Sequence, residues 1–216
     1  EKPEENAPAV VFDQVTFGYD PSLPILKQLS FTIAPGEHVF ILGRSGAGKS
    51  TIFKLLLGLY QPQGGAIRLF GENPQAIPDA AKRRVYGCVE QDFQAIQGNL
   101  RDQIALFDPA ITDEEIWAAL RLSRLEAVVR ALPEQLDTPM SSGLFSRGQL
   151  QLLSIARAVV TSPRLLLLDE ITANLDSETE QNILEALEAA AEGRTVLSIS
   201  HRLSAVMNDK RKIHLN

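Results

Sequence analysis

Short apolar runs rich in Val, Ile and Phe recur over the first third of the chain. They occupy residues 10–12, 15–17, 29–33, 39–42 and 67–70. Breaks rich in Asp, Pro and Gly separate them, which is typical of strands. Between the last two runs, residues 49–59 carry apolar side chains at helical spacing, and Ile52, Phe53, Leu56 and Leu59 share one face. We therefore predict strand, glycine-rich turn and helix in this order.

In the middle third, the strand patterns give way to helix caps. After a short apolar run at residues 85–89, a Ser or Thr stands three residues before a Glu or Gln in three places. The pairs are Thr112 with Glu115, Ser123 with Glu126, and Ser146 with Gln149. Such pairs satisfy backbone N–H groups at the start of a helix. We therefore predict one strand followed by a helical region.

The last third returns to strand patterns. Residues 165–168 and 196–199 are continuous apolar runs, which are typical of parallel strands covered on both faces. We expect a helix between them, capped by Ser177 with Glu180 and closed by Gly193. Its inward-facing residues would be Ile183, Leu184 and Leu187. Strands and helices in this order predict an α/β fold with a mostly parallel sheet.

Composition adds limits to this picture. The 216 residues are 44% hydrophobic and 22% charged, with a net charge of -6, as in an ordinary globular protein. No apolar run approaches the roughly 20 residues of a membrane-spanning helix. The acidic balance argues against nucleic-acid backbone binding. We expect the basic triplet at residues 82–84 to be a solvated helix face.

Three smaller features concern the setting of the chain. Cys88 is the single cysteine, which excludes an internal disulfide and suits a reducing compartment. We expect Cys88 and Trp117 to serve packing. Residues 1–8 are polar and contain proline, so they predict a linker. Because the chain starts with Glu1 and shows no signal segment, we expect it to be a piece of a longer protein.

The strongest chemical motif is GRSGAGKS at residues 43–50, a full match to GxxxxGKS between a predicted strand and a predicted helix. Its glycines let successive N–H groups point into one concavity, to which the helix start adds a positive end. Lys49 would neutralise terminal phosphates, and the Ser50 hydroxyl would ligate Mg2+. The predicted nucleotide-binding residues are Gly43, Arg44, Ser45, Gly46, Ala47, Gly48, Lys49, Ser50 and Thr51.

A second motif is the acidic pair Asp169 and Glu170, which follows four leucines. A buried strand that ends there would place both carboxylates at the edge of the sheet where ligands bind. Asp169 could hold magnesium, and Glu170 could orient or deprotonate the water that attacks the γ-phosphate. Taken alone, such a pair is also compatible with a helix cap or a solvated turn.

Residues 145–149, FSRGQ, complete a family resemblance. They resemble the LSGGQ signature of the nucleotide-binding domain of ABC (ATP-binding cassette) transporters, with Phe for Leu and Arg for the first Gly. Ser146 can cap the following helix, Gly148 permits close approach, and a helix start attracts anions. The resemblance extends from about residue 9 to residue 213. It implies a P-loop NTPase core with a mostly parallel sheet, an N-terminal antiparallel β subdomain and an inserted α-helical subdomain.

The resemblance also implies boundaries and an assembly. Residues 9–216 would form one ATPase domain, with a core at 9–91 and 161–216 and a helical subdomain at about 92–160. In the family, two such domains dimerise head to tail. The signature residues Ser146, Gly148 and Gln149 of one subunit would then close over ATP held by Lys49 of the other.

Four further roles follow from the resemblance alone. Tyr19 is similar to the aromatic residue that stacks on adenine, although a lone aromatic residue could equally belong to the core. Gln91 resembles the glutamine that senses Mg2+ and the attacking water. His201 resembles the histidine that donates a hydrogen bond to the γ-phosphate. Asp176 matches a loop that communicates across the dimer, or serves as an ordinary acid at a helix start.

Departures from the family pattern concern the signature and its surroundings. Arg147 replaces a small residue, and Leu150 replaces a basic one. A Glu that exporters commonly carry before the signature is missing from residues 140–143. We expect these changes to affect the geometry of the site across the dimer and the coupling to the membrane part.

The function implied is ATP hydrolysis that powers a membrane exporter, with ATP and Mg2+ as cofactors. The implied partners are a second nucleotide-binding domain and transmembrane domains of the same polypeptide, with no nucleic acid, at the cytoplasmic face of the membrane. Three alternatives stay open. They are a soluble ATPase of this type acting on DNA or ribosomes, a small-molecule phosphotransferase, and a module that holds ATP without turning it over.

Overall fold

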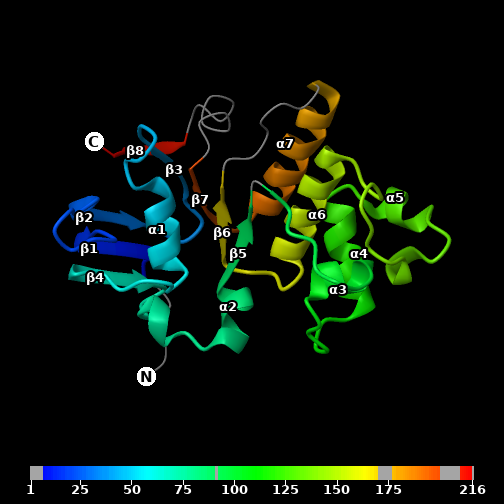
Figure 1. Cartoon of the computed structure of the whole chain (residues 1–216), viewed down its shortest axis with the longest axis horizontal. Coiled ribbons are helices and arrows are strands. Elements are labelled where there is room, and N and C mark those ends of the chain that lie inside the picture. The colour runs from blue at the N-terminus through cyan, green and yellow to red at the C-terminus, as the bar shows by residue number, and fades with distance from the viewer. Residues whose placement is uncertain (1–6, 91, 170–176, 200–209, 216) are drawn as a thin grey trace. The chain divides into compact units, whose positions relative to one another are not determined.

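The computed structural model describes residues 7–90, 92–169, 177–199 and 210–215 (Figure 1). The chain divides into two compact units, one of residues 1–82 with 194–216 and the other of residues 83–193. The linker expected at residues 1–8 and the helical subdomain expected at about 92–160 stay predictions. Within the described residues, no helix combines the length and hydrophobicity needed to cross a bilayer.

The first unit contains an antiparallel sheet with the strand order β2-β1-β4. Its strands are β1 (Val10–Phe17), β2 (Leu26–Ile33) and β4 (Gly64–Leu69). The sequence predicted two strands where the structure has the single strand β1. Its pairing with β2 shifts register between Phe12 and Val15, where Gln14 has a φ of 49°. The polar residues there form a β-bulge, which bends a strand without ending it.

Parallel strands lie in the same unit. β3 (His38–Leu42) pairs in parallel with β7 (Thr195–Ser198) and with β8 (Arg211–His214). Helix α1 (Lys49–Leu56) follows β3, and the short helices η1 (Pro74–Ala76) and α2 (Asp79–Val85) follow β4. The strand–turn–helix order predicted from the sequence is therefore present.

Helix α1 is shorter than the predicted helix over residues 49–59. Gly58 adopts a φ of 72°, a left-handed conformation that commonly closes a helix at its C-terminal end. Its backbone N–H donates to the carbonyl of Leu55. Leu59 lies beyond this turn with 62% of its surface exposed. The prediction that Leu59 shares the buried face with Ile52 and Leu56 is wrong, because the helix ends before it.

The second unit holds β5 (Tyr86–Val89) and β6 (Leu165–Leu168), which pair in parallel. All four residues of β6 are buried, as expected for a strand covered on both faces. The helices are α3 (Leu100–Ala105), α4 (Asp113–Leu122), α5 (Glu126–Arg130), η2 (Gln135–Asp137), α6 (Arg147–Val159) and α7 (Ser177–Ala191). Helix α6 is central, since it packs against β5, α3, α4 and α7.

Two of the three predicted caps are confirmed. Thr112 caps α4 and Ser146 caps α6, each in a reciprocal box with the residue three positions later. The Ser123 cap is wrong, because Ser123 ends α4 instead of starting a helix. Its buried hydroxyl donates to the carbonyl of Leu120 at 3.2 Å. Leu125 stands before α5, so apolar burial determined the geometry of this turn.

The helix predicted between the last two apolar runs is present as α7, which starts at Ser177 itself. Ile183 and Leu187 are buried, whereas Leu184 is only partly buried. The small residues Ala186 and Ala190 complete the buried face. The mixed α/β architecture with a parallel sheet and an antiparallel sheet thus agrees with the predicted fold class.

Candidate functional site

The glycine-rich loop at residues 43–50 lies between the end of β3 and the start of α1. Gly46 has a φ of 83° and Gly48 a φ of 96°, a region of backbone conformation that favours glycine. A Cβ atom on Gly48 would lie 2.7 Å from Cδ2 of Leu26. Gly48 is therefore required both by its backbone conformation and by its contact with β2.

Lys49 folds back over this loop. Its Nζ atom donates to the carbonyl oxygens of Gly43 at 2.6 Å and of Arg44 at 3.0 Å. Helix α1 has no side-chain cap at Gly48 and no acidic residue in its first turn. The positive end of the helix and the ammonium group thus lie in the same loop, and neither is neutralised by an acid of α1. Such a loop suits an anion with several phosphate groups.

Tyr19 lies beside the same helix and is 49% exposed, so it is not a core residue. Its hydroxyl oxygen is 3.3 Å from Oγ1 of Thr51, and its ring packs edge to face with Phe17 and Tyr60 at centroid distances of 5.3 Å. Nζ of Lys54 lies 5.1 Å from the ring centroid. The Tyr19 ring is thus held in place and half exposed near the glycine-rich loop, which are the conditions that stacking on a base requires.

These neighbours also act on the Tyr19 hydroxyl. Partial burial raises its pKa, but the hydroxyl of Thr51 and the ammonium group of Lys54 together lower it by more. The pKa of Tyr19 therefore lies below the ordinary value. Sequence reasoning identified Tyr19 and Thr51 but missed Tyr60 and Lys54. Lys54 stands three residues after Thr51 on α1, which was the available signal.

The signature at residues 145–149 forms the start of α6 in the second unit. The backbone N–H of Gln149 donates to Oγ of Ser146 at 3.2 Å, and the Gln149 side chain accepts from the Ser146 N–H at 2.9 Å. Ser146 and Arg147 are exposed, whereas Phe145 is buried. The cap uses the Ser146 hydroxyl as an acceptor, so its O–H can still donate to a ligand.

Gly148 is buried and has a structural role within its own chain. A Cβ atom on Gly148 would lie 2.1 Å from Cγ2 of Thr179. The close approach expected for Gly148 is therefore made by helix α7, because Thr179 occupies the space beside it. Sequence reasoning could not assign this partner, since the contact joins residues 31 positions apart.

Asp169 directly follows β6, and its N–H donates to the carbonyl of Val89 at 3.0 Å. Cys88 lies on the paired strand β5. Burial raises the pKa of the Cys88 thiol to about 12, helped by the negative charges of Glu90 and Asp169. Four residues of the predicted site or its surroundings lie outside the described residues: Gln91, Glu170, Asp176 and His201.

The described site residues fall into two groups. The first unit brings Tyr19 to Thr51 and to the loop that carries Gly43, Arg44, Ser45, Gly46, Ala47, Gly48, Lys49 and Ser50. The second unit holds the signature residues Ser146, Gly148 and Gln149, and also Asp169. Each unit therefore carries its own set of polar groups suited to a phosphate or to a cation that accompanies it.

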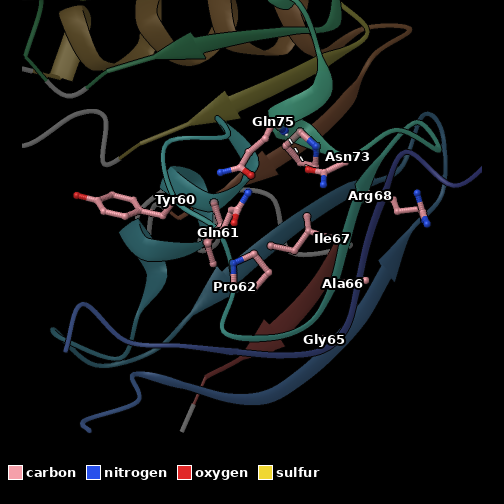
Figure 2. Close-up of a pocket in the computed structure, with 11 residues that line it drawn as sticks. Tyr60, Gln61, Pro62, Gly65, Ala66, Ile67, Arg68, Asn73 and Gln75 are labelled. Carbon is pink, nitrogen blue, oxygen red and sulfur yellow. Dashed lines mark hydrogen bonds between the residues drawn. The ribbon is translucent and has the colours of Figure 1, made fainter. Parts of the chain in front are cut away.

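A pocket of about 300 Å³ lies beside the rings of Phe17, Tyr19 and Tyr60, and Tyr60 forms part of its lining. Figure 2 shows that Arg68, the charged residue among those that line it, extends away from Gln61, Pro62 and Ile67. The remaining residues that line it are Leu55, Gly65, Ala66, Asn73, Pro74 and Gln75. Because no charged group converges on this pocket, it does not suit a phosphate, and the glycine-rich loop remains the candidate site.

Comparisons with known proteins agree with this geometry. The family model described as ABC transporter matches residues 26–173. An uncharacterised ABC transporter ATP-binding protein of Bacillus subtilis, YfiC, is 40% identical over 92% of this chain and 33% of its own length. The mycobactin import ATP-binding/permease protein IrtA of Mycolicibacterium smegmatis is 39% identical over 94% of this chain and 24% of its own length.

A solved structure is also similar. The chain of a bacterial Atm1-family ABC exporter with ATP bound superposes with a TM-score of 0.84 and 37% identity, covering 98% of this chain and 38% of that one. This chain thus spans a third or less of the two curated relatives. The family model covers more than half of the chain and includes both the glycine-rich loop and the signature. The chain therefore belongs to the ABC transporter family, as an ATP-binding cassette of that family.

Proposed function

We propose that this chain binds and hydrolyses ATP to power a membrane exporter. The observation that carries the proposal is the geometry around α1. Lys49 at the start of this helix bends over the glycine-rich loop, and Thr51 two positions later contacts the hydroxyl of Tyr19. A loop that suits phosphates and a half-exposed ring that suits a base thus both adjoin helix α1. A nucleoside triphosphate has both parts.

The residues divide the chemistry between them. Loop N–H groups and Lys49 bind the phosphates and neutralise their charge, and Tyr19 stacks on the base. Ser50 in the first unit and Asp169 in the second carry hard oxygen ligands of the kind that Mg2+ prefers, so each residue fits this ion by its own chemistry. When bound, Mg2+ would neutralise charge on the phosphates. Gln91 joins this set in the proposal, and its placement lies outside the described residues.

Hydrolysis needs groups that act on water and on the terminal phosphate. In the proposal, Glu170 orients or deprotonates the attacking water, and His201 donates a hydrogen bond to the γ-phosphate. Both follow strands in the sequence, Glu170 one residue after Asp169 and His201 three residues after β7. The carboxyl ends of parallel strands are the usual place for such groups.

The signature completes the site from a second copy or a homologous domain. We propose that Ser146, Gly148 and Gln149 approach the nucleotide held by the partner's glycine-rich loop in a head-to-tail dimer. The exposed start of α6, with the O–H of Ser146 available, supports this role. The exposed Arg147 adds a cation where a small residue is usual, which would favour a phosphate.

The membrane part of the proposal rests on the relatives. The Mycolicibacterium relative is named a mycobactin import ATP-binding/permease protein, which supports a permease partner. The similar solved structure is named an exporter, which supports the export direction. We propose transmembrane partner domains, a site at the cytoplasmic face, and transport in the export direction. We also propose a core at residues 9–91 and 161–216 with a helical subdomain at about 92–160. Nothing in these comparisons supports an ATPase that acts on DNA or ribosomes.

The experiment is ATP hydrolysis by the intact protein in lipid vesicles. We expect turnover in the wild type and loss of at least about a hundredfold in Glu170→Gln, with ATP still bound. Glu178→Gln is the matched control, because Glu178 is an exposed acid at the start of α7. A wild type without ATPase activity contradicts the enzymatic proposal. Activity that is equal in the Glu170 and Glu178 variants contradicts the role of Glu170.

A further inference from the structure

Arg157, in the last turns of α6, reaches two carbonyl groups outside its own helix. Its Nε donates to the carbonyl of Gln103 at 2.6 Å, and its Nη1 donates to the carbonyl of Gln94 at 2.9 Å. Its Cζ lies 4.0 Å from the ring centroid of Phe93. One guanidinium group therefore joins helix α6 to helix α3 and to the segment of residues 92–96.

Gln103 strengthens the same junction from α3. It is fully buried, its side-chain oxygen accepts from the N–H of Ile96 at 2.9 Å, and its amide nitrogen donates to the carbonyl of Ile96 at 2.9 Å. These two hydrogen bonds use both the N–H and the carbonyl of Ile96, as pairing with a neighbouring strand would. Residues 93, 94 and 96 thus have polar or ring contacts to Arg157 or Gln103.

The other side of this segment is also attached to α6. The N–H of Glu90 donates to Oγ of Ser154, which is buried, at 3.3 Å. Helix α6 therefore holds the chain directly before Gln91 through Ser154 and shortly after it through Arg157. The same helix begins at the signature residue Ser146.

An arginine is suited to this task. Its planar group forms several hydrogen bonds in fixed directions and stacks on an aromatic ring, which an ammonium group cannot do. Burial lowers the pKa of Arg157 to about 10; Glu90 acts in the opposite direction, and the nearby Arg83 lowers the pKa further. Burial of the charged group is therefore the main unfavourable contribution to this arrangement. Arg83 adds to the junction, because it donates to the carbonyl groups of Ile104 and Ala105 at the end of α3.

This finding corrects the expectation for the basic triplet. Residues 82–84 were expected to be a solvated helix face, and Lys82 does form a partly exposed pair with Asp79 at 2.6 Å. Arg83 is partly buried instead, since its guanidinium group is used as a cap for α3. The sequence pattern of a charge run could not reveal a carbonyl partner 22 residues away.

We propose that Arg157 is a positioning residue: it holds residues 93–96 against helix α6, and the role proposed for Gln91 in hydrolysis depends on this junction. The proposal rests on the function proposed above, because it assigns Arg157 an effect on the hydrolysis step. It assigns no contact between Arg157 and the nucleotide. It predicts that loss of Arg157 loosens residues 92–96 and lowers the rate of hydrolysis only where Gln91 is present.

The first test does not depend on ATP hydrolysis. Amide hydrogen exchange of residues 92–96 is measured in the intact protein and in the variant Arg157→Met. We expect exchange there to become roughly tenfold faster, because the carbonyl groups of Gln94 and Gln103 lose their common donor. Arg101→Met is the control, since Arg101 on α3 pairs with Asp113 and Asp137 and does not reach this segment. Equal exchange in both variants overturns the proposal.

The second test is kinetic and uses a double-mutant cycle with Gln91→Ala. We expect Arg157→Met to lower kcat for ATP roughly ten- to hundredfold with little change in KM, because geometry and not binding is lost. In the Gln91→Ala background, the same change should add almost nothing. Equal losses in the two backgrounds would show that Arg157 acts independently of Gln91, and they would overturn the proposal.

A conservative variant separates charge from geometry. Arg157→Lys keeps the cation but cannot bridge both carbonyl groups, so we expect its kcat to stay near that of Arg157→Met. Full activity in Arg157→Lys overturns the bridging role. If the wild type hydrolyses ATP and Gln91→Ala lowers kcat while Arg157→Met does not, only this proposal fails. If the wild type is inactive, the proposed function fails, and the exchange experiment still decides on the junction.

Discussion

Thr179 of α7 occupies the space in which a side chain on Gly148 of α6 would lie, at 2.1 Å from its Cγ2 to the Cβ position. Helices α6 and α7 therefore pack closely where the signature begins. We expect Gly148→Ala to destabilise the protein by about 1–3 kcal/mol, because β-branched Thr179 has little freedom to move aside. Thermal unfolding measures the effect.

Two further variants check this prediction. Thr179→Ser removes the Cγ2 atom, so the double variant should recover most of the stability. Gly64→Ala is the matched control, because its nearest new contact would lie at an ordinary 3.6 Å. A Gly148→Ala protein as stable as the wild type would show that the two helices separate at no cost.

A second prediction concerns Lys49, whose Nζ donates to the carbonyl groups of Gly43 and Arg44. We expect Lys49→Ala to weaken ATP binding roughly tenfold or more, because the ammonium group neutralises phosphate charge. Isothermal titration calorimetry measures the affinity, with Lys27→Ala, an exposed lysine on β2, as the control. Unchanged affinity in Lys49→Ala would contradict a phosphate-binding role.

A third prediction distinguishes the ring of Tyr19 from its hydroxyl. Tyr19→Phe should keep most of the affinity for ATP, whereas Tyr19→Ala should lose about 1–3 kcal/mol of binding free energy, the typical value of base stacking. Inorganic triphosphate should bind both variants equally, since it has no base. An equal loss of triphosphate binding in Tyr19→Ala would mean that the ring supports the loop instead.

A fourth prediction follows from Cys88. The pKa of its thiol is raised from 9.0 to about 12, so the fold favours the protonated form. The resulting stability is fully present below pH 9 and is lost as the pH rises towards 12. We expect alkylation of Cys88 by iodoacetamide at pH 8 to be at least about tenfold slower in the folded than in the unfolded protein.

The control for this prediction is Cys88→Ser, which removes the alkylation product and the thiol's share of the alkaline loss of stability. Equal alkylation rates in the folded and unfolded wild type would show that the thiol is neither buried nor influenced by Glu90 and Asp169.

Much of the fold could be predicted from local patterns. The run at residues 165–168 has the same bounds as β6, and the glycine-rich loop could be placed between β3 and α1. Both depend on neighbours in the sequence, through hydrophobic periodicity and backbone freedom. The reciprocal caps of Thr112 and Ser146 were predictable for the same reason.

Contacts between distant residues were not predictable. Ser123 has the sequence of a cap, but it ends α4, and the fully buried Leu125 stands at the start of α5 instead. Gly148 could be recognised as a position of close approach, whereas its partner Thr179 could not be identified. The contacts of Arg157 with Gln94 and Gln103 span more than fifty residues and have no local signal. Tertiary packing determines each of these outcomes.

The start of α1 has a practical consequence. Its first turn contains no acidic side chain and Gly48 supplies no cap, so its backbone donors are available to multiply charged oxyanions other than a nucleotide. Sulfate and inorganic phosphate in a buffer would then compete with the nucleotide, and binding measured in them would appear too weak. Work on this chain belongs in chloride or acetate solutions.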